Sequence, residues 1–308
     1  MKKMILWITL LLGISVTCMA EKEIQIGITQ IIEHPSLDAA RKGLEKALQK
    51  NLGKKVKIEY QSAQGDFGTA QLIAKSYVNS KKDVIVAIST PSAQAALNAT
   101  KQIPIVYTAV TDPKIAGLSG KNITGTTDMS PLEEQLNLLK NLLPKAKKVG
   151  FLYNPSEQNS VSLLKQFTIL AKERQLQVIE KGVNTVNDMN LALNSLLGQV
   201  DVLYIPTDNL VTSSESLLIQ QANRKNVPVI ASVESSVKKG ALATVSIDYE
   251  KLGYQTGERI LEILKGKSPN QIQVEGLRET TLVINERIAK KYGISVKQEV
   301  FKGAVLYE

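Results

Sequence analysis

A strand–turn–helix pattern that occurs twice is the feature that most constrains the fold of this chain. In the first copy, Asp83 precedes the continuous apolar run Val84–Ile88, the polar turn Ser89–Ser92 and an alanine-rich segment. An apolar run without alternation is typical of a strand buried on both faces, and hence of a parallel sheet. The second copy is Asp201–Asn209, and two flanking segments recur in the same order. These pairs are Ile26–Gln30 with Val149–Tyr153, and Ile103–Ala109 with Val227–Val233.

Helical segments alternate with the strands, which predicts two similar α/β lobes, each a doubly wound parallel sheet. The expected helices are Leu37–Asn51, Thr69–Ser80, Leu132–Leu143, Ser160–Arg174, Asn187–Leu197, Ser213–Lys225, Tyr249–Lys265 and Glu286–Tyr292. Additional extended segments are expected at Lys55–Tyr60, Leu176–Gly182, Ala241–Ile247 and Val274–Ile284, before a tail of residues 294–308. Ligands of open α/β sheets bind beyond the carboxyl ends of the strands, so one cleft between two facing lobes is the expected site.

The N-terminus predicts export. Met1–Lys3 is basic, Met4–Val16 is an apolar run too short to span a membrane comfortably, and small residues end at Ala20. We therefore expect residues 1–20 to be a cleaved signal peptide and the protein to be periplasmic or otherwise extracytoplasmic. Cys18, the only cysteine, raises lipid anchoring as an alternative, although Thr17 before it departs from the usual small residue. Cleavage after Ala20 would leave a chain without cysteine, and hence without disulfides.

Composition excludes several classes of function. The 308 residues are 43% hydrophobic, enough for one large or two ordinary domains with real cores. The formal net charge is +9, but the lysines occur as scattered pairs without an arginine-rich arm, so solvated surface is favoured over nucleic-acid binding. No Walker loop, dinucleotide fingerprint or nucleophile elbow is present, and His34 is the only histidine. We therefore expect that the protein is not an enzyme and that it binds neither a cofactor nor a metal ion.

Short polar side chains gather instead at the predicted strand ends of both halves. The candidate ligand-binding residues are Gln30, Gln64, Thr90, Ser92, Thr108, Asp112, Asn154, Thr207, Asp208, Asn209, Ser232 and Asp248. Such residues also cap helices and turns, so their collective placement is the stronger argument. Thr90 and Ser92 open a helix, a place that suits an anion, and the second copy carries Asp208 there. Facing each other, the two turns would suit the two ends of an amino-acid zwitterion. His34 is expected at the cleft rim or as a cap of the first helix.

The chain resembles the substrate-binding proteins of ABC transporters of the tryptophan/tyrosine type, within the type I periplasmic-binding-protein superfamily. The motifs that carry the resemblance are Ile28–Gln30, Glu33–Pro35, Leu37–Gly43, Thr90–Gln94, Ala109–Pro113, Asp128–Pro131, Leu152–Glu157, Pro206–Asn209, Gly240–Val245 and Ile247–Tyr249. The resemblance implies an aromatic amino acid clamped between two lobes and delivered to a membrane permease and its ATPase. It also implies a monomer that does no chemistry.

The resemblance also suggests roles within the cleft. Thr90, Ser92 and Thr108 would hold the ligand carboxylate. The ammonium would go to Asp208, or alternatively to Asp112 or Glu234. Hydrogen bonds from the second lobe would come from Asn154 and Asn209, and Gln30 and Gln64 would border the entrance.

The lobes are predicted as residues 21–126 plus 246–279 and residues 127–245 plus 280–308. The predicted hinge strands lie near Gly125–Asp128, Thr244–Asp248 and Arg278–Leu282. Three alternatives stay open at this point. They are a sensor of the same fold that binds a sugar, a nucleoside or another amino acid, an enzyme using His34 or the aspartates, and a DNA-binding regulator with a similar effector domain. The predicted signal peptide argues against the regulator.

Overall fold

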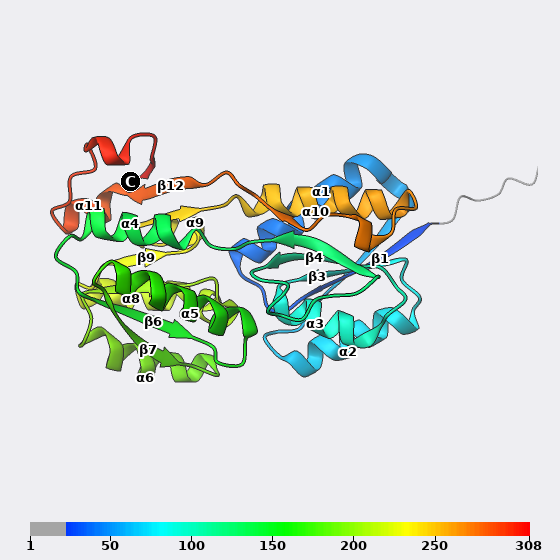
Figure 1. The fold of residues 1–308 in the computed structure, drawn as a ribbon, viewed down its shortest axis with the longest axis horizontal. Coiled ribbons are helices and arrows are strands. Elements are labelled where there is room, and N and C mark those ends of the chain that lie inside the picture. The colour runs from blue at the N-terminus through cyan, green and yellow to red at the C-terminus, as the bar shows by residue number, and fades with distance from the viewer. Residues whose placement is uncertain (1–22) are drawn as a thin grey trace, which may run out of the picture.

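The computed structural model describes residues 23–308, which form two α/β lobes side by side (Figure 1). The predicted signal peptide and Cys18 lie outside these residues. Within them, no helix has both the length and the apolar character needed to cross a membrane.

The first lobe is built on a six-stranded sheet. Its strands, in spatial order, are β11 (Glu275–Gly276), β5 (Ile123–Thr127), β4 (Ile105–Val110), β3 (Val84–Ile88), β1 (Ile24–Gln30) and β2 (Val56–Ser62). All the pairings are parallel. The helices are α1 (Pro35–Leu52), α2 (Phe67–Asn79), α3 (Thr90–Ala99) and α10 (Tyr249–Leu264). α1 packs against α10 and α2 against α3, so one helix pair covers each face (Figure 1).

The second lobe is built on a seven-stranded sheet. Its strands, in spatial order, are β13 (Val305–Tyr307), β12 (Thr281–Asn285), β10 (Ala243–Ser246), β9 (Val229–Ala231), β8 (Val202–Ile205), β6 (Lys148–Tyr153) and β7 (Gln177–Gly182). Its helices are α4 (Leu132–Leu142), α5 (Gln158–Glu173), α6 (Val186–Leu197), α7 (Asn209–Ser213), α8 (Glu215–Arg224), α9 (Glu234–Lys238) and α11 (Glu286–Lys291). The pairing of β12 with β10 is antiparallel, unlike the other pairings in this sheet.

The two lobes share one strand order, which confirms the predicted α/β class and the internal repeat. β2-β1-β3-β4-β5 in the first sheet corresponds to β7-β6-β8-β9-β10 in the second. The correspondence extends to single residues. Asp83 accepts a hydrogen bond from the backbone N–H of Gln25, and Asp201 accepts from those of Lys147 and Lys148. Each aspartate thus ties the start of one central strand to its neighbour.

Three details differ from the sequence prediction. The helix predicted at Ser213–Lys225 corresponds to α8, and the short helix α7 that precedes it was not predicted. The segment predicted to be extended as one unit, Val274–Ile284, holds two short strands that belong to different sheets. The tail contains β13, only three residues long and therefore without a readable period.

Three connections carry the chain between the sheets. They are residues 128–131 after β5, residues 247–248 after β10 and residues 277–280 between β11 and β12. The predicted hinge segments overlap these connections, although parts of them are strand residues. The lobe boundaries themselves remain a prediction.

Candidate ligand cleft

The strand order places a switch point in each lobe. Helices leave β1 and β3 toward opposite faces of the first sheet, and the same occurs at β6 and β8 in the second. A crevice opens beyond the carboxyl ends of strands at such a point, and ligands of open α/β sheets bind there. The residues that follow these four strands are therefore the first place to seek a site.

A small enclosed cavity of about 20 Å³ lies at this place. It is lined from both lobes, by His34, Ser36, Leu37, Ala109, Thr111, Asp128, Asn159, Thr207, Asn209, Thr212, Val233 and Tyr249. The volume holds about one water molecule. An amino acid could therefore enter only if the two lobes moved apart.

The start of α3 carries three hydroxyl groups without partners. Ser89, Thr90 and Ser92 are each at most 2% exposed, and none of their hydroxyl oxygens has a hydrogen-bond partner in the structure. Buried polar groups are almost always paired, so an unpaired trio at one helix start points to a ligand. Ser89 also has a φ of 85°, a strained conformation of the kind found at binding sites. Hydroxyls and free N–H groups together suit a carboxylate.

Asp128 supplies a buried acid to the cavity. It lies in the first connection between the lobes, and it accepts hydrogen bonds from the hydroxyls of Tyr249 (2.9 Å) and Thr111 (3.2 Å). Burial raises the pKa of its carboxyl group. Each carboxylate oxygen can accept a further hydrogen bond, so Asp128 can still bind an ammonium group.

The second lobe contributes asparagines held by an acid beneath them. Asn159 and Asn209 line the cavity, and both donate side-chain hydrogen bonds to the buried carboxylate of Glu157. Burial and the neighbouring Asp208 raise the pKa of Glu157 to about 7.

His34 faces these asparagines from the first lobe. It occupies the N-cap position of α1, but its side chain makes no capping bond, so the cap role raised from sequence is wrong. Its ring is buried and lines the cavity together with Asn209. Burial lowers the pKa of the ring to about 4, against the pull of Glu215 and Asn209, so the closed form holds a neutral histidine.

The predicted residues beyond the strand ends fall into two groups. Thr207 and Asn209 line the cavity, whereas Thr90 and Ser92 belong to the unpaired trio at the start of α3, outside the cavity lining. Gln30 is buried beside them at the end of β1. Its amide nitrogen donates to Ile32 and Asp38, while its side-chain oxygen has no partner.

Other predicted residues serve the lobes internally. Asp208 is the N-cap of α7, and its carboxylate accepts from Val211 N, Asn154 N and the Ser160 hydroxyl. Asn154 itself donates to Glu157 rather than lining the cavity.

Two predicted hydroxyl residues are also bonded inside the lobes. The Thr108 hydroxyl accepts from Thr126, and that of Ser232 pairs with Tyr204.

The remaining predicted residues lie at the surface or in turns. Gln64 and Asp248 are exposed, and Asp248 caps α10 by accepting from Lys251 N. Asp112 closes a turn by accepting from the backbone of Lys114 and Ile115. Glu234, the other alternative for the ammonium, pairs with Lys238 and Tyr307.

Sequence reasoning missed the most deeply placed residues of the cleft, Asp128, Glu157 and Asn159. Each lies within a few residues of a strand end, which is the signal that could have found them. Asp128 directly follows β5, a strand that was not predicted because ITGTT lacks a continuous apolar run.

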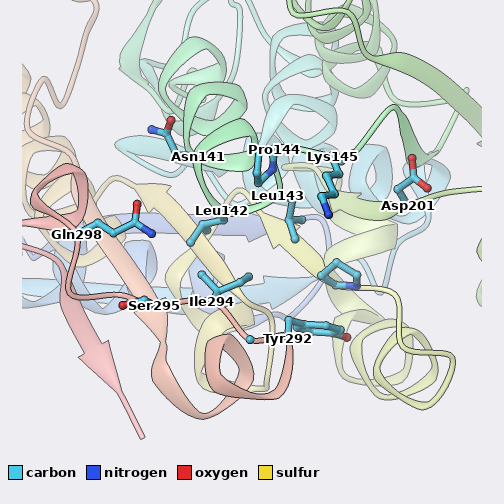
Figure 2. Close-up of a pocket in the computed structure, with 13 residues that line it drawn as sticks. Asn141, Leu142, Leu143, Pro144, Lys145, Asp201, Tyr292, Ile294, Ser295 and Gln298 are labelled. Atoms are coloured by element: carbon cyan, nitrogen blue, oxygen red, sulfur yellow. The ribbon is translucent and has the colours of Figure 1, made fainter.

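A larger hollow of about 660 Å³ lies elsewhere on the second lobe (Figure 2). It sits at the amino ends of the strands, between the Leu142–Lys145 loop and the Tyr292–Ser295 segment, beside Asp201 (Figure 2). None of its lining side chains has a buried polar atom without a partner, whereas the cleft has several. The cleft is therefore the better candidate. Among residues 23–308, no group of three or more His, Cys, Asp or Glu side chains could hold a metal ion.

Comparisons with known proteins identify a family that the chain matches over almost its whole length. The model of the family described as "ABC transporter substrate binding protein" matches residues 25–306. A tyrosine-binding protein of Clostridioides difficile is 50% identical over 280 residues, which cover 88% of this chain and 81% of that protein.

Two solved structures add a structural comparison. An ABC domain from Streptococcus pneumoniae in complex with L-Trp is 33% identical over 91% of this chain and 99% of that chain, with a TM-score of 0.87. A ligand-free, open substrate-binding protein from Clostridium difficile is 44% identical over 92% of this chain and 99% of that chain, with a TM-score of 0.69.

Proposed function

We propose that this chain, which belongs to the family of ABC transporter substrate-binding proteins, captures an aromatic L-amino acid between its lobes and delivers it to an importer. The observation that carries the proposal is a pair of complementary groups beyond the carboxyl ends of the strands. Unpaired buried hydroxyls at the start of α3 suit a carboxylate, and Asp128, which lines the cavity, suits an ammonium. The cleft carries no activated nucleophile, so binding without chemistry is the function that it supports best.

Apolar groups of the cavity favour an aromatic side chain. Leu37, Ala109, Val233 and the ring of Tyr249 line the cavity together with the polar groups. These four residues stand among eight polar ones, and apolar side chains in a small-molecule site contact the apolar part of the ligand. The relatives support the same ligand class, since one is named as tyrosine-binding and another was crystallised with L-Trp.

Hinge closure would be the mechanism of capture. The cavity is too small for an amino acid, so the lobes must separate before a ligand can enter. The TM-score against the Trp-bound structure, 0.87, is higher than that against the ligand-free open structure, 0.69, although the latter protein shares more sequence identity with this chain. This chain would therefore alternate between an open form and a closed form like the present one.

The proposed partners are the permease and ATPase subunits of an importer, with the binding protein as a monomer on the extracytoplasmic side. The family membership supports the transporter partners. The monomeric state rests on the resemblance in sequence alone.

A fluorescence titration tests the proposal directly. Trp7 is the only tryptophan of the chain, so a protein that begins at Glu21 contains none. Added L-Trp then reports its own burial by a blue shift of its emission, and L-Tyr or L-Phe should reverse the shift by competition.

Thermal unfolding gives a second readout. A ligand at 100 times its Kd stabilises a protein by about 2.7 kcal/mol, or roughly 5–10 °C for a chain of this size. Galactose and adenosine serve as controls and should leave the melting temperature unchanged. Stabilisation by either control, without any effect of the aromatic amino acids, would refute the proposed ligand.

A further inference from the structure

Glu157 is the buried acid of the second lobe that the proposed function does not use. It follows β6, its side chain is buried, and it lies behind the cavity wall rather than in it. Its carboxylate accepts hydrogen bonds from Asn209 Nδ2, Asn159 Nδ2 and Asn154 Nδ2. The backbone N–H groups of Asn209 and Leu210 also donate to it.

All five of these groups are donors. An ionised carboxylate only accepts, so it presents no hydrogen to any of these donors. A protonated carboxyl must turn one O–H toward an acceptor, and the five neighbours offer none at that point. Protonation would therefore loosen the asparagines.

The two cavity asparagines depend on this acid for their orientation. Asn159 and Asn209 line the cavity, where Asn209 lies opposite His34 of the first lobe. Glu157 is thus linked through Asn209 to a contact that joins the two lobes.

We propose that Glu157 is a positioning residue, whose ionised carboxylate holds Asn159 and Asn209 in the orientation that binds the ligand and closes the cleft. Ligand affinity then follows the ionisation of Glu157. This inference rests on the proposed function, because it concerns the same cleft.

The surroundings place the transition in an accessible pH range. Burial and the charge of Asp208 raise the pKa of Glu157 to about 7. The titratable groups that face it are Asp208 of its own lobe and, beyond Asn209, His34 of the other lobe, whose pKa is lowered to about 4 by burial. Burial also raises the pKa of Asp208, so Glu157 and Asp208 are expected to change charge as an interacting pair, with a transition near pH 7.

The expected effect has a defined sign. Without ligand, the closed arrangement carries a proton on Glu157 below about pH 7, and a ligand that requires the ionised carboxylate must release that proton. The Kd for L-Trp should therefore rise about tenfold for each pH unit below the transition and level off above it. Titration calorimetry in two buffers with different ionisation enthalpies should show protons released on binding at pH 6 and almost none at pH 8.

The variant Glu157→Gln attributes the effect to this residue. Its amide nitrogen would point a donor at donors, so binding at pH 8 should be at least about tenfold weaker than in the native protein. The pH dependence between 6 and 8 should also disappear. This test separates Glu157 from Asp128, whose pKa is also raised by burial. The control Glu180→Gln, at an exposed site in β7, should keep both the affinity and the pH dependence.

The outcomes separate the two proposals. Binding of L-Trp at pH 8 supports the proposed function whatever its pH dependence. A flat Kd from pH 6 to 8 without proton release in the native protein overturns the role of Glu157, even if the variant does not fold. A folded Glu157→Gln protein with native affinity and native pH dependence overturns it as well.

Discussion

The contact between α1 and α10 offers a sharp test of how the first lobe positions the cleft. Both helices begin at the cleft, α1 directly after His34 and α10 at Tyr249. They approach closely because glycines face the partner helix. A Cβ atom at Gly253 would overlap the backbone carbonyl of Ala40, and one at Gly257 would lie 2.5 Å from the Cβ of Ala47.

The substitution Gly253→Ala should destabilise the protein despite its effect on helix propensity. Alanine in a helix interior is favoured over glycine by about 1 kcal/mol, so an exposed site would be stabilised. Here the helices must move apart, and overpacking of this kind costs about 1–3 kcal/mol. Because the clash is with backbone atoms, the upper end of this range applies. The net free energy of unfolding should therefore fall by about 2 kcal/mol, and the melting temperature by roughly 4–8 °C.

The assay is urea unfolding of Gly253→Ala, and the control is the variant Gly198→Ala measured in the same way. Gly198 ends α6 with a φ of −78°, and a Cβ atom added there would meet no neighbouring atom within 4 Å, so alanine fits without strain. That control should gain about 0.4–1 kcal/mol by restricting the unfolded chain. If Gly253→Ala were as stable as the native protein, the close approach of α1 and α10 would be refuted.

Three further predictions concern the cleft. Ser92→Ala should weaken L-Trp binding at least about fivefold in calorimetry without lowering the melting temperature, because its hydroxyl has no partner within the protein; unchanged affinity would remove it from the site. Asp128→Asn should weaken the binding of L-Trp far more than the binding of indole-3-propionate, which lacks the ammonium group. An equal loss of affinity for both compounds would contradict the proposal that Asp128 binds the ammonium. The pKa of His34 is about 4 in the folded protein against 6.5 when unfolded. The buried neutral ring therefore contributes fully to the free energy of unfolding above pH 6.5, and this contribution is lost, by up to about 3 kcal/mol, as the pH falls to 4. As the pH falls from 6.5 to 4, the free energy of unfolding of His34→Gln should therefore rise relative to that of the native protein. A difference that stays constant with pH would show that the ring is not buried as a neutral group.

Much of the fold could be predicted because its signals are local and repeated. Val84–Ile88 is apolar at every position, and its counterpart after Asp201 places the same strand in the second sheet. β5 and β13 escaped prediction for a physical reason. β5 owes its burial to partners far along the chain, since the Thr126 hydroxyl bonds to those of Thr108 and Thr256. No local pattern encodes such a contact.

The positions of candidate residues could be predicted where the backbone decides them. Thr90 and Ser92 open a helix at a strand end, as the sequence pattern predicted. The prediction failed where side-chain direction decides. Ser232 follows a strand in the same way, yet its hydroxyl turns to Tyr204 in the core.

The acid of the cleft shows why the repeat was a partial guide. The repeat aligns Thr90 with Asp208, which suggested that the two turns hold opposite ends of a zwitterion. Internal symmetry copies the backbone, however, and aspartate at an N-cap is drawn to the helix N–H groups, as Asp208 is to Val211 N. Asp128 lies in a connection between the sheets, where its carboxylate lines the cavity. An ammonium bound by Asp128 would therefore contact one of the segments that must bend when the lobes close, so that ligand contact and closure would be coupled through the same residue.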